Sequence, residues 1–137
     1  MKSALIAVSL VLLTLGHLAR ADESDRAQYS RSMTETYNQK TLLKNWALSV
    51  CLAKISKDPA AKADANATAS AYLEFGQQPI EAYDALRDLA DRYANRKYGG
   101  AVESEFNTMK CIDLFHSKEL DQLASKLAKN GRKPTAP

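Results

Sequence analysis

Two cysteines and the one histidine outside residues 1–21 are the residues of this sequence whose types could do chemistry. They are Cys51, Cys111 and His116. A thiolate beside an imidazole is the arrangement of a cysteine nucleophile and its base. Cys111 and His116 are five residues apart, however, so on one helix their side chains diverge. A cysteine held in a disulfide also cannot attack a substrate. We therefore expect no catalytic residue here, and a histidine that simply ends a helix.

The sequence also lacks the motifs of metal and cofactor sites. It has no C-x-x-C, H-x-x-x-H or C-x-x-C-H pattern, no phosphate-binding loop and no dinucleotide fingerprint. Acidic residues at positions 81, 84, 88 and 91 fall between apolar positions of one predicted helix, which makes them its solvated face. An enzyme would need a nucleophile or a metal site, and the sequence supplies neither. We expect a protein that is not an enzyme and holds no metal or cofactor.

The N-terminus has the pattern of a secretory signal peptide. Lys2 supplies the positive charge, residues 4–15 form the apolar run, and residues 19–21 read A-R-A at a cleavage site. The apolar run is too short to span a bilayer comfortably, so we expect no membrane association after cleavage. Residues 1–21 are thus predicted to be removed, leaving one domain of residues 22–137. In an oxidising compartment, its two cysteines are expected to be bridged.

The charge balance of the mature chain is close to neutral. The whole sequence has 19 Lys and Arg against 16 Asp and Glu, but Lys2 and Arg20 belong to the signal peptide. The remaining excess is a single positive charge, and no basic face with stacking aromatic residues is evident. This pattern argues against nucleic acid as a partner.

The body of the chain is predicted to be all-α, a small bundle of about five helices. Alanine, leucine and lysine are common, and no period-two alternation competes with helical spacing. Asp58-Pro59 is expected to end the first helix, Gly76 to cap the second in a left-handed conformation, and Pro79 to begin the third. Ser117 is expected to cap the fifth. The predicted ranges are 34–57, 63–75, 79–96, 104–116 and 117–131, with residues 22–33 and 132–137 flexible.

Apolar residues at helical spacing predict the core. The first helix is apolar on so many sides that we expect it to be central. Residues 97–105 break the helical pattern, and Gly99-Gly100 there predicts a loop with backbone angles closed to other residues. The predicted core positions include Leu43, Trp46, Ala47, Val50, Cys51, Ile55, Ala67, Ala71, Tyr72, Phe75, Ile80, Tyr83, Leu86, Leu89, Ala90, Tyr93, Phe106, Met109, Cys111, Ile112, Phe115, Leu120, Leu123, Ala124 and Leu127.

Three stretches of the sequence resemble one known family. They are LLKNWALSVCLAK (residues 42–54), SAYLEFGQQPIEAYDAL (residues 70–86) and FNTMKCIDLFHSKELDQL (residues 106–123). In this order, they are similar to the periplasmic immunity proteins that neutralise type VI secretion amidase effectors, specifically the fourth amidase-immunity family. The similarity covers nearly all of the mature chain. It includes one cysteine in the first stretch and another in the third.

The resemblance implies a structure, a location and a partner. It implies a periplasmic, mostly helical protein with a disulfide between Cys51 and Cys111, and a homodimer. The partner would be a cognate peptidoglycan amidase, a papain-like cysteine amidase that cuts the D-glutamyl–diaminopimelate bond. In the family, a loop between helices enters the active-site cleft of the amidase. The matching residues here are Lys97, Tyr98, Gly99, Gly100, Ala101, Val102, Glu103, Ser104 and Glu105.

The chemistry of this loop suits such a role. The glycines would let the backbone approach a narrow cleft closely, and Glu103 and Glu105 could offer carboxylates where the stem peptide presents its own. Two other interpretations remain open at this point. The loop could be a connector without a partner, and the protein could be a periplasmic chaperone-like or structural module that holds other exported proteins.

Overall fold

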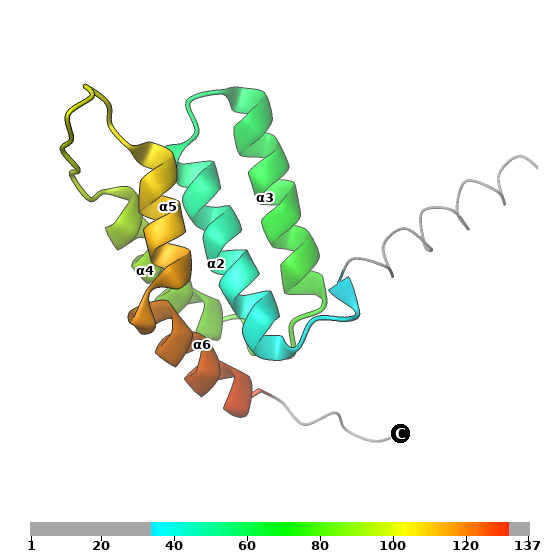
Figure 1. The fold of residues 1–137 in the computed structure, drawn as a ribbon. Coiled ribbons are helices and arrows are strands. Elements are labelled where there is room, and N and C mark those ends of the chain that lie inside the picture. The colour runs from blue at the N-terminus through cyan, green and yellow to red at the C-terminus, as the bar shows by residue number, and fades with distance from the viewer. Residues whose placement is uncertain (1–33, 132–137) are drawn as a thin grey trace, which may run out of the picture. The chain divides into compact units, whose positions relative to one another are not determined.

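The computed structural model of the chain describes residues 34–131, and five helices fill most of this range (Figure 1). The chain divides into two units, Met1–Thr36 and Tyr37–Pro137, and all five helices lie in the second unit. The predicted signal peptide and the ends predicted to be flexible lie outside the described residues. Within the described range, no helix combines the length and apolar character needed to cross a membrane. The helices are α2 (Gln39–Ile55), α3 (Pro59–Glu74), α4 (Ala82–Ala94), α5 (Asn107–His116) and α6 (Lys118–Lys129).

Helix α2 is the centre of the bundle, as its apolar sequence predicts. It packs against each of the other four helices, which surround it in Figure 1. Its Leu43, Ala47 and Cys51 are completely buried, and the ring of Trp46 meets that of Tyr83 on α4 edge-on, with centroids 5.0 Å apart. The helix begins five residues later than predicted, because the side chain of Asn38 accepts a hydrogen bond from the Thr41 N–H and caps it there.

Pro59 begins a helix in addition to limiting the one before it. Helix α2 ends at Ile55, and Pro59 then occupies the first turn of α3, where its missing N–H costs nothing. The carboxylate of Asp58 accepts from the Ala61 N–H at 2.9 Å and caps the new helix. The prediction that this helix begins at residue 63 was therefore wrong by four residues.

Gly76 is required because the side chain of Tyr83 approaches it closely. We predicted a left-handed cap at this residue, but α3 is capped by Phe75 and no glycine among residues 34–131 has a positive φ. A Cβ placed on Gly76 would lie 1.9 Å from the hydroxyl oxygen of Tyr83. The prediction of the cap was wrong, and the glycine instead leaves room for a buried tyrosine.

Helices α4 and α5 are shorter than predicted. A turn in which Pro79 O accepts from the Ala82 N–H precedes α4, and the side chain of Asn95 donates to Asp91 O at its end. Helix α5 begins at Asn107, not at residue 104. Ser117 separates α5 from α6, and its hydroxyl accepts from the Leu120 N–H at 3.0 Å, which confirms the predicted cap.

The all-α prediction is confirmed, and most predicted core residues are buried or half-buried. Leu86, Leu89, Ala90, Cys111, Leu120 and Ala124 are inaccessible to solvent, and Tyr83 and Tyr93 are nearly so. The acidic residues at 81, 84 and 88 are exposed, as predicted, but Asp91 is half-buried and lies 2.7 Å from the ammonium of Lys54.

Five predicted core residues were placed wrongly. Ala67 and Ala71 are exposed, because α3 buries Ala65 and Ala69 instead. Ile80 is 61% exposed because it lies in the turn before α4. Met109 and Ile112 are 47% and 51% exposed because none of the helices α2, α3, α4 and α6 covers their side of α5.

Candidate functional site

The candidate site is the segment that joins α4 to α5, residues 96–106, called here the α4–α5 loop. It has no helical structure and protrudes from one end of the bundle (Figure 1). All of the residues from 97 to 105 that we predicted to bind a partner lie in it, and all except Tyr98 are exposed. The loop therefore presents its side chains and backbone to solvent, with its two stems rising from α4 and α5.

The first stem is held by aromatic and polar contacts. The guanidinium of Arg96 lies 3.4 Å from the centroid of the Tyr93 ring, a cation–π contact at the end of α4. The Tyr98 hydroxyl donates a hydrogen bond of 2.6 Å to the carboxylate of Asp113 on α5. This hydrogen bond raises the pKa of the Tyr98 hydroxyl, because it stabilises the protonated form. The stem is thereby tied to both helices that it connects.

The second stem is held by an ion pair. The Glu105 carboxylate lies 2.8 Å from the ammonium of Lys57, in the connection between α2 and α3, and accepts a 2.8 Å hydrogen bond from the Asn107 side chain. These bonds lower the pKa of the Glu105 carboxyl. The next residue, Phe106, has a φ of 50°, which is uncommon for an aromatic residue. A left-handed residue turns the chain sharply into the first turn of α5.

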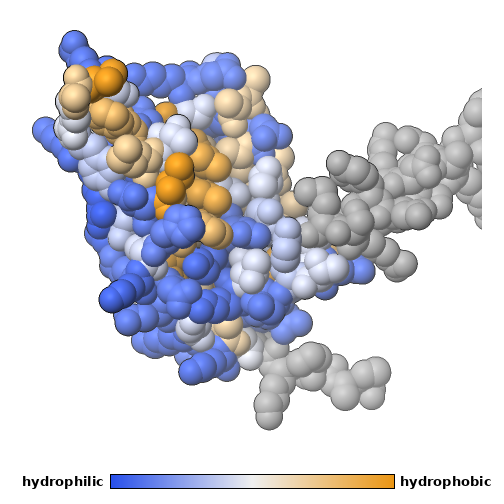
Figure 2. Space-filling view, viewed as in Figure 1, coloured by the Kyte–Doolittle hydropathy of each residue, from blue (hydrophilic) through white to orange (hydrophobic). Residues whose placement is uncertain are grey.

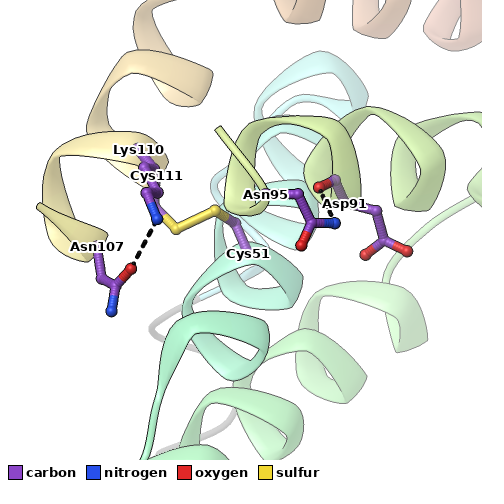
Figure 3. The surroundings of a disulfide bond; sticks show 6 residues. All are labelled: Cys51, Asp91, Asn95, Asn107, Lys110 and Cys111. Atoms are coloured by element: carbon purple, nitrogen blue, oxygen red, sulfur yellow. Dashed lines mark hydrogen bonds between the residues drawn. A yellow bond between two sulfur atoms is a disulfide. The ribbon is translucent and has the colours of Figure 1, made fainter. Parts of the chain in front are cut away.

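A hollow separates the two stems beneath the arch of the loop. Its lining includes Arg96 and Tyr98 from one stem, Ser104 and Glu105 from the other, and Lys110. Lys110 is only 8% exposed, and its ammonium donates to the Asn107 side chain at 2.9 Å (Figure 3). A buried positive charge also attracts the Glu105 carboxylate. The loop is thus supported at its stems and stands clear of the bundle between them.

The tip of the loop, residues 99–103, has few contacts of its own. Val102 is 71% exposed, and no hydrogen bond or ion pair of the Glu103 side chain is found within residues 34–131. Our reason for the paired glycines was wrong, since neither has a positive φ. A Cβ on Gly100 would lie 2.8 Å from the Phe106 ring, whereas one on Gly99 would meet open space. The Phe106 ring therefore packs against the backbone of Gly100, and a side chain at position 100 would displace the ring.

The two carboxylates that we predicted to act together, Glu103 and Glu105, have different surroundings in the structure. Glu105 is engaged with Lys57 and Asn107 and braces the second stem. Glu103 lies at the exposed tip. Of the two, only Glu103 is free to present its charge to a partner without breaking a contact seen in the structure.

The disulfide lies directly below the second stem. Cys51 and Cys111 are bonded, with Cα atoms 5.7 Å apart, and both are fully buried (Figure 3). The bond joins central helix α2 to α5 one turn after Asn107. The predicted pairing is confirmed, and neither thiol is available as a nucleophile. His116 is exposed at the end of α5, and no cluster of potential metal ligands occurs in the described part of the chain.

Three residues that support the loop were missed by the sequence analysis. Lys57 is 48 positions from Glu105, and Asp113 is 15 positions from Tyr98, so no local pattern links either pair. Lys110 is an ordinary helical lysine in the sequence. Its position one residue before a core cysteine was the one available sign that it would be buried.

Comparisons with known proteins agree on one family. The model of the family described as "Type VI secretion system (T6SS), amidase immunity protein" matches residues 41–124. A search of curated proteins gave no match. Among solved structures, a chain of the Tae4/Tai4 effector–immunity system from Salmonella typhimurium is 52% identical, with a TM-score of 0.66, over 69% of this chain and 93% of that one.

Two further structures support the same assignment. One, from work on type VI-secreted toxins and self-resistance proteins in Serratia marcescens, is 33% identical with a TM-score of 0.66, over 71% of this chain and 80% of that one. The other is a complex between the Salmonella typhimurium effector Tae4 and the immunity protein Tai4 from Enterobacter cloacae. It is 27% identical with a TM-score of 0.58, over 65% of this chain and 92% of that one. The chain belongs to the type VI secretion system amidase immunity family.

Proposed function

We propose that this protein binds a type VI secretion amidase and inhibits it by placing the α4–α5 loop in the active-site cleft. The immunity role follows from membership of the family and from relatives that belong to effector–immunity systems. An immunity protein acts on one folded enzyme and is not itself an enzyme. The chaperone-like alternative is therefore set aside.

The observation that carries the cleft mechanism is the form of the loop. Its tip is exposed and nearly free of contacts, while both stems are fixed to the bundle. A protruding segment that is already positioned loses little conformational freedom when it binds, so more of the contact energy appears as affinity. The bonded Cys51 and Cys111 fix α5, which carries the second stem, to the centre of the bundle.

Location and assembly are part of the same proposal. A periplasmic protein would meet an amidase that acts on peptidoglycan, and the signal-peptide pattern of residues 1–21 supports export. We also propose the homodimer that the family resemblance implies. A periplasmic location would protect the producing cell and its kin from an effector delivered to the cell wall.

The test is inhibition of the Salmonella typhimurium effector Tae4 by residues 22–137. This effector is a suitable probe because an immunity protein from another species has been solved bound to it. Replacing residues 99–103 with Gly-Ser should abolish inhibition while leaving the helical circular dichroism unchanged. Full inhibition by this variant would exclude the cleft mechanism, and full cleavage in excess intact protein would count against inhibition of this effector.

A second variant tests the contribution of charge. Glu103→Gln should weaken inhibition if the tip carboxylate takes the place of a stem-peptide carboxylate. Glu81→Gln is the matched control, because it removes an exposed carboxylate just before α4, at the end opposite the loop. Equal potency of the two variants would show that the loop acts by shape alone.

A further inference from the structure

An apolar groove lies beside the second stem of the loop. Two adjoining hollows, which share Asn107 and Thr108, extend from the stem along α5 and across α2 towards α3. Figure 2 shows hydrophobic residues over this face, continuing towards the tip of the loop. The large apolar side chains that line the groove are Leu52, Ile55, Phe106, Met109 and Ile112.

The groove exists because α3 and α5 both pack on α2 and hardly on each other. The side of α2 between them is left with Leu52 and Ile55 in its floor, and the outer side of α5 is left with Met109 and Ile112. Leu52, Met109 and Ile112 are among the few large apolar side chains that are exposed in the described residues. Exposed apolar residues gathered in one hollow are typical of an interaction surface.

The charges of the groove restrict its partner. Three charged residues line the two hollows, and two of them, Lys57 and Glu105, are paired with each other. Asp64 on α3 is the third. A surface of this kind favours an apolar partner and offers little to a strongly charged one.

The groove is continuous with the loop. Ser104, Glu105 and Phe106 belong to the second stem and also line the first hollow. Any cleft that accepts the tip must place its rim against the stems, because the stems are where the loop emerges from the bundle. The rim on this side would lie over Phe106, Met109 and Ile112.

We propose that the groove receives an apolar segment on the rim of the amidase's cleft, and so forms a second part of the effector interface. This inference rests on the proposed function, since the loop brings the rim to the groove. The loop would block the cleft, and the groove would contribute affinity. Removing apolar contacts from the groove should therefore weaken binding without preventing complete inhibition at saturation.

The experiment compares groove, loop and control variants against the Salmonella typhimurium effector Tae4. Met109→Ser with Ile112→Ser should raise the Kd roughly 10- to 100-fold, because two exposed apolar anchors are lost. Ile80→Ser is the matched control, since Ile80 is also an exposed apolar residue. It lies just before α4, at the end of that helix opposite the loop, so the Kd of this variant should not change. Leu52→Ser gives an independent change in the floor of the groove. Circular dichroism and urea unfolding confirm that each variant is folded.

The outcomes separate this inference from the proposed function. Inhibition that survives replacement of residues 99–103 contradicts the loop mechanism. If that replacement abolishes inhibition but the groove variants bind as tightly as the unaltered protein, the groove is not part of the interface. If the groove variants lose only self-association, measured by light scattering, the groove is a contact between copies of this chain, and the inference is again overturned.

Discussion

The α4–α5 loop and the core around the disulfide are held by different kinds of interaction. In the core, α2, α4 and α5 meet through fully buried side chains such as Leu43, Leu89 and Leu114, together with a covalent bond. The loop is fixed through exposed polar pairs at its stems. Buried apolar contacts contribute most of the folding free energy, whereas exposed pairs contribute little. Stability and inhibition should therefore respond to different mutations.

The largest effect should come from the disulfide. Cys51→Ala with Cys111→Ala opens a loop with a sequence separation of 60, which in the chain-entropy model lowers the free energy of unfolding by about 4 kcal/mol. Urea unfolding measures the loss, and the unaltered protein in a reductant is the control. Inhibition measured where the variant is still folded should change far less. A variant that keeps its stability but no longer inhibits would contradict the view that the core sets stability and the loop sets inhibition.

A smaller loss of stability is expected at the end of the bundle opposite the loop. Gly76→Ala brings a Cβ against the Tyr83 hydroxyl and should cost about 2 kcal/mol, with inhibition unchanged. Adding Tyr83→Phe removes the clashing oxygen and should restore part of the loss, as a double-mutant cycle of urea midpoints would show. Independent, additive effects of the two substitutions would mean that the hydroxyl is not what the glycine accommodates.

In the loop, a substitution should weaken binding to the amidase more than it lowers stability. Tyr98→Phe removes the hydrogen bond to Asp113 and should weaken binding to the amidase roughly fivefold, with no measurable change in the urea midpoint. Tyr37→Phe, near the start of α2, is the control for the loss of an exposed tyrosine hydroxyl. A fall in stability without a change in affinity would show that this hydrogen bond stabilises the fold, as the core contacts do, and does not position the loop.

The smallest effect is expected when the pH is lowered and the ion pair of Glu105 is lost. The folded protein lowers the pKa of Glu105 below its ordinary value of 4.5, so the contribution of the ion pair with Lys57 is complete above that value. It is lost as the pH falls through the lowered pKa. Amide signals of Gly99 and Gly100 should then shift as the pH falls below 4.5, while circular dichroism stays constant.

The same experiment has a matched control for the position of the charge. Glu105→Gln should give the acid-type amide signals at every pH. Asp121→Asn removes another carboxylate whose pKa is lowered, in its case by Lys40 and Lys44. Asp121 is on α6, which follows the end of α5 away from the loop. Loop signals that respond equally to both substitutions would show that the second stem does not depend on its ion pair.

Much of the bundle could be predicted because its signals are local. Helical spacing identified the buried faces of α2, α4 and α6, and Ser117 was recognised as a cap from its neighbours. Spacing alone could not place Met109 and Ile112. A helix shows which of its residues are apolar, but the position of neighbouring helices decides which of them are covered.

The loop was found as a break in the helical pattern, but its supports could not be. Lys57 and Asp113 reach it from other elements, and only the packing of α2, α3 and α5 brings them within hydrogen-bonding distance. Glu103 and Glu105 likewise look equivalent in the sequence. They differ because one lies within reach of Lys57 and the other does not.

The disulfide also has a consequence for proteolysis. The bond between Cys51 and Cys111 closes a covalent ring that contains α3, α4 and the whole of the exposed loop. Exposed loop tips are preferred sites of cleavage by proteases. A single cut at the tip would open the ring without dividing the protein, because the two fragments would stay joined through the sulfurs. The nicked protein should therefore run as one species on a gel until it is reduced, and then as two.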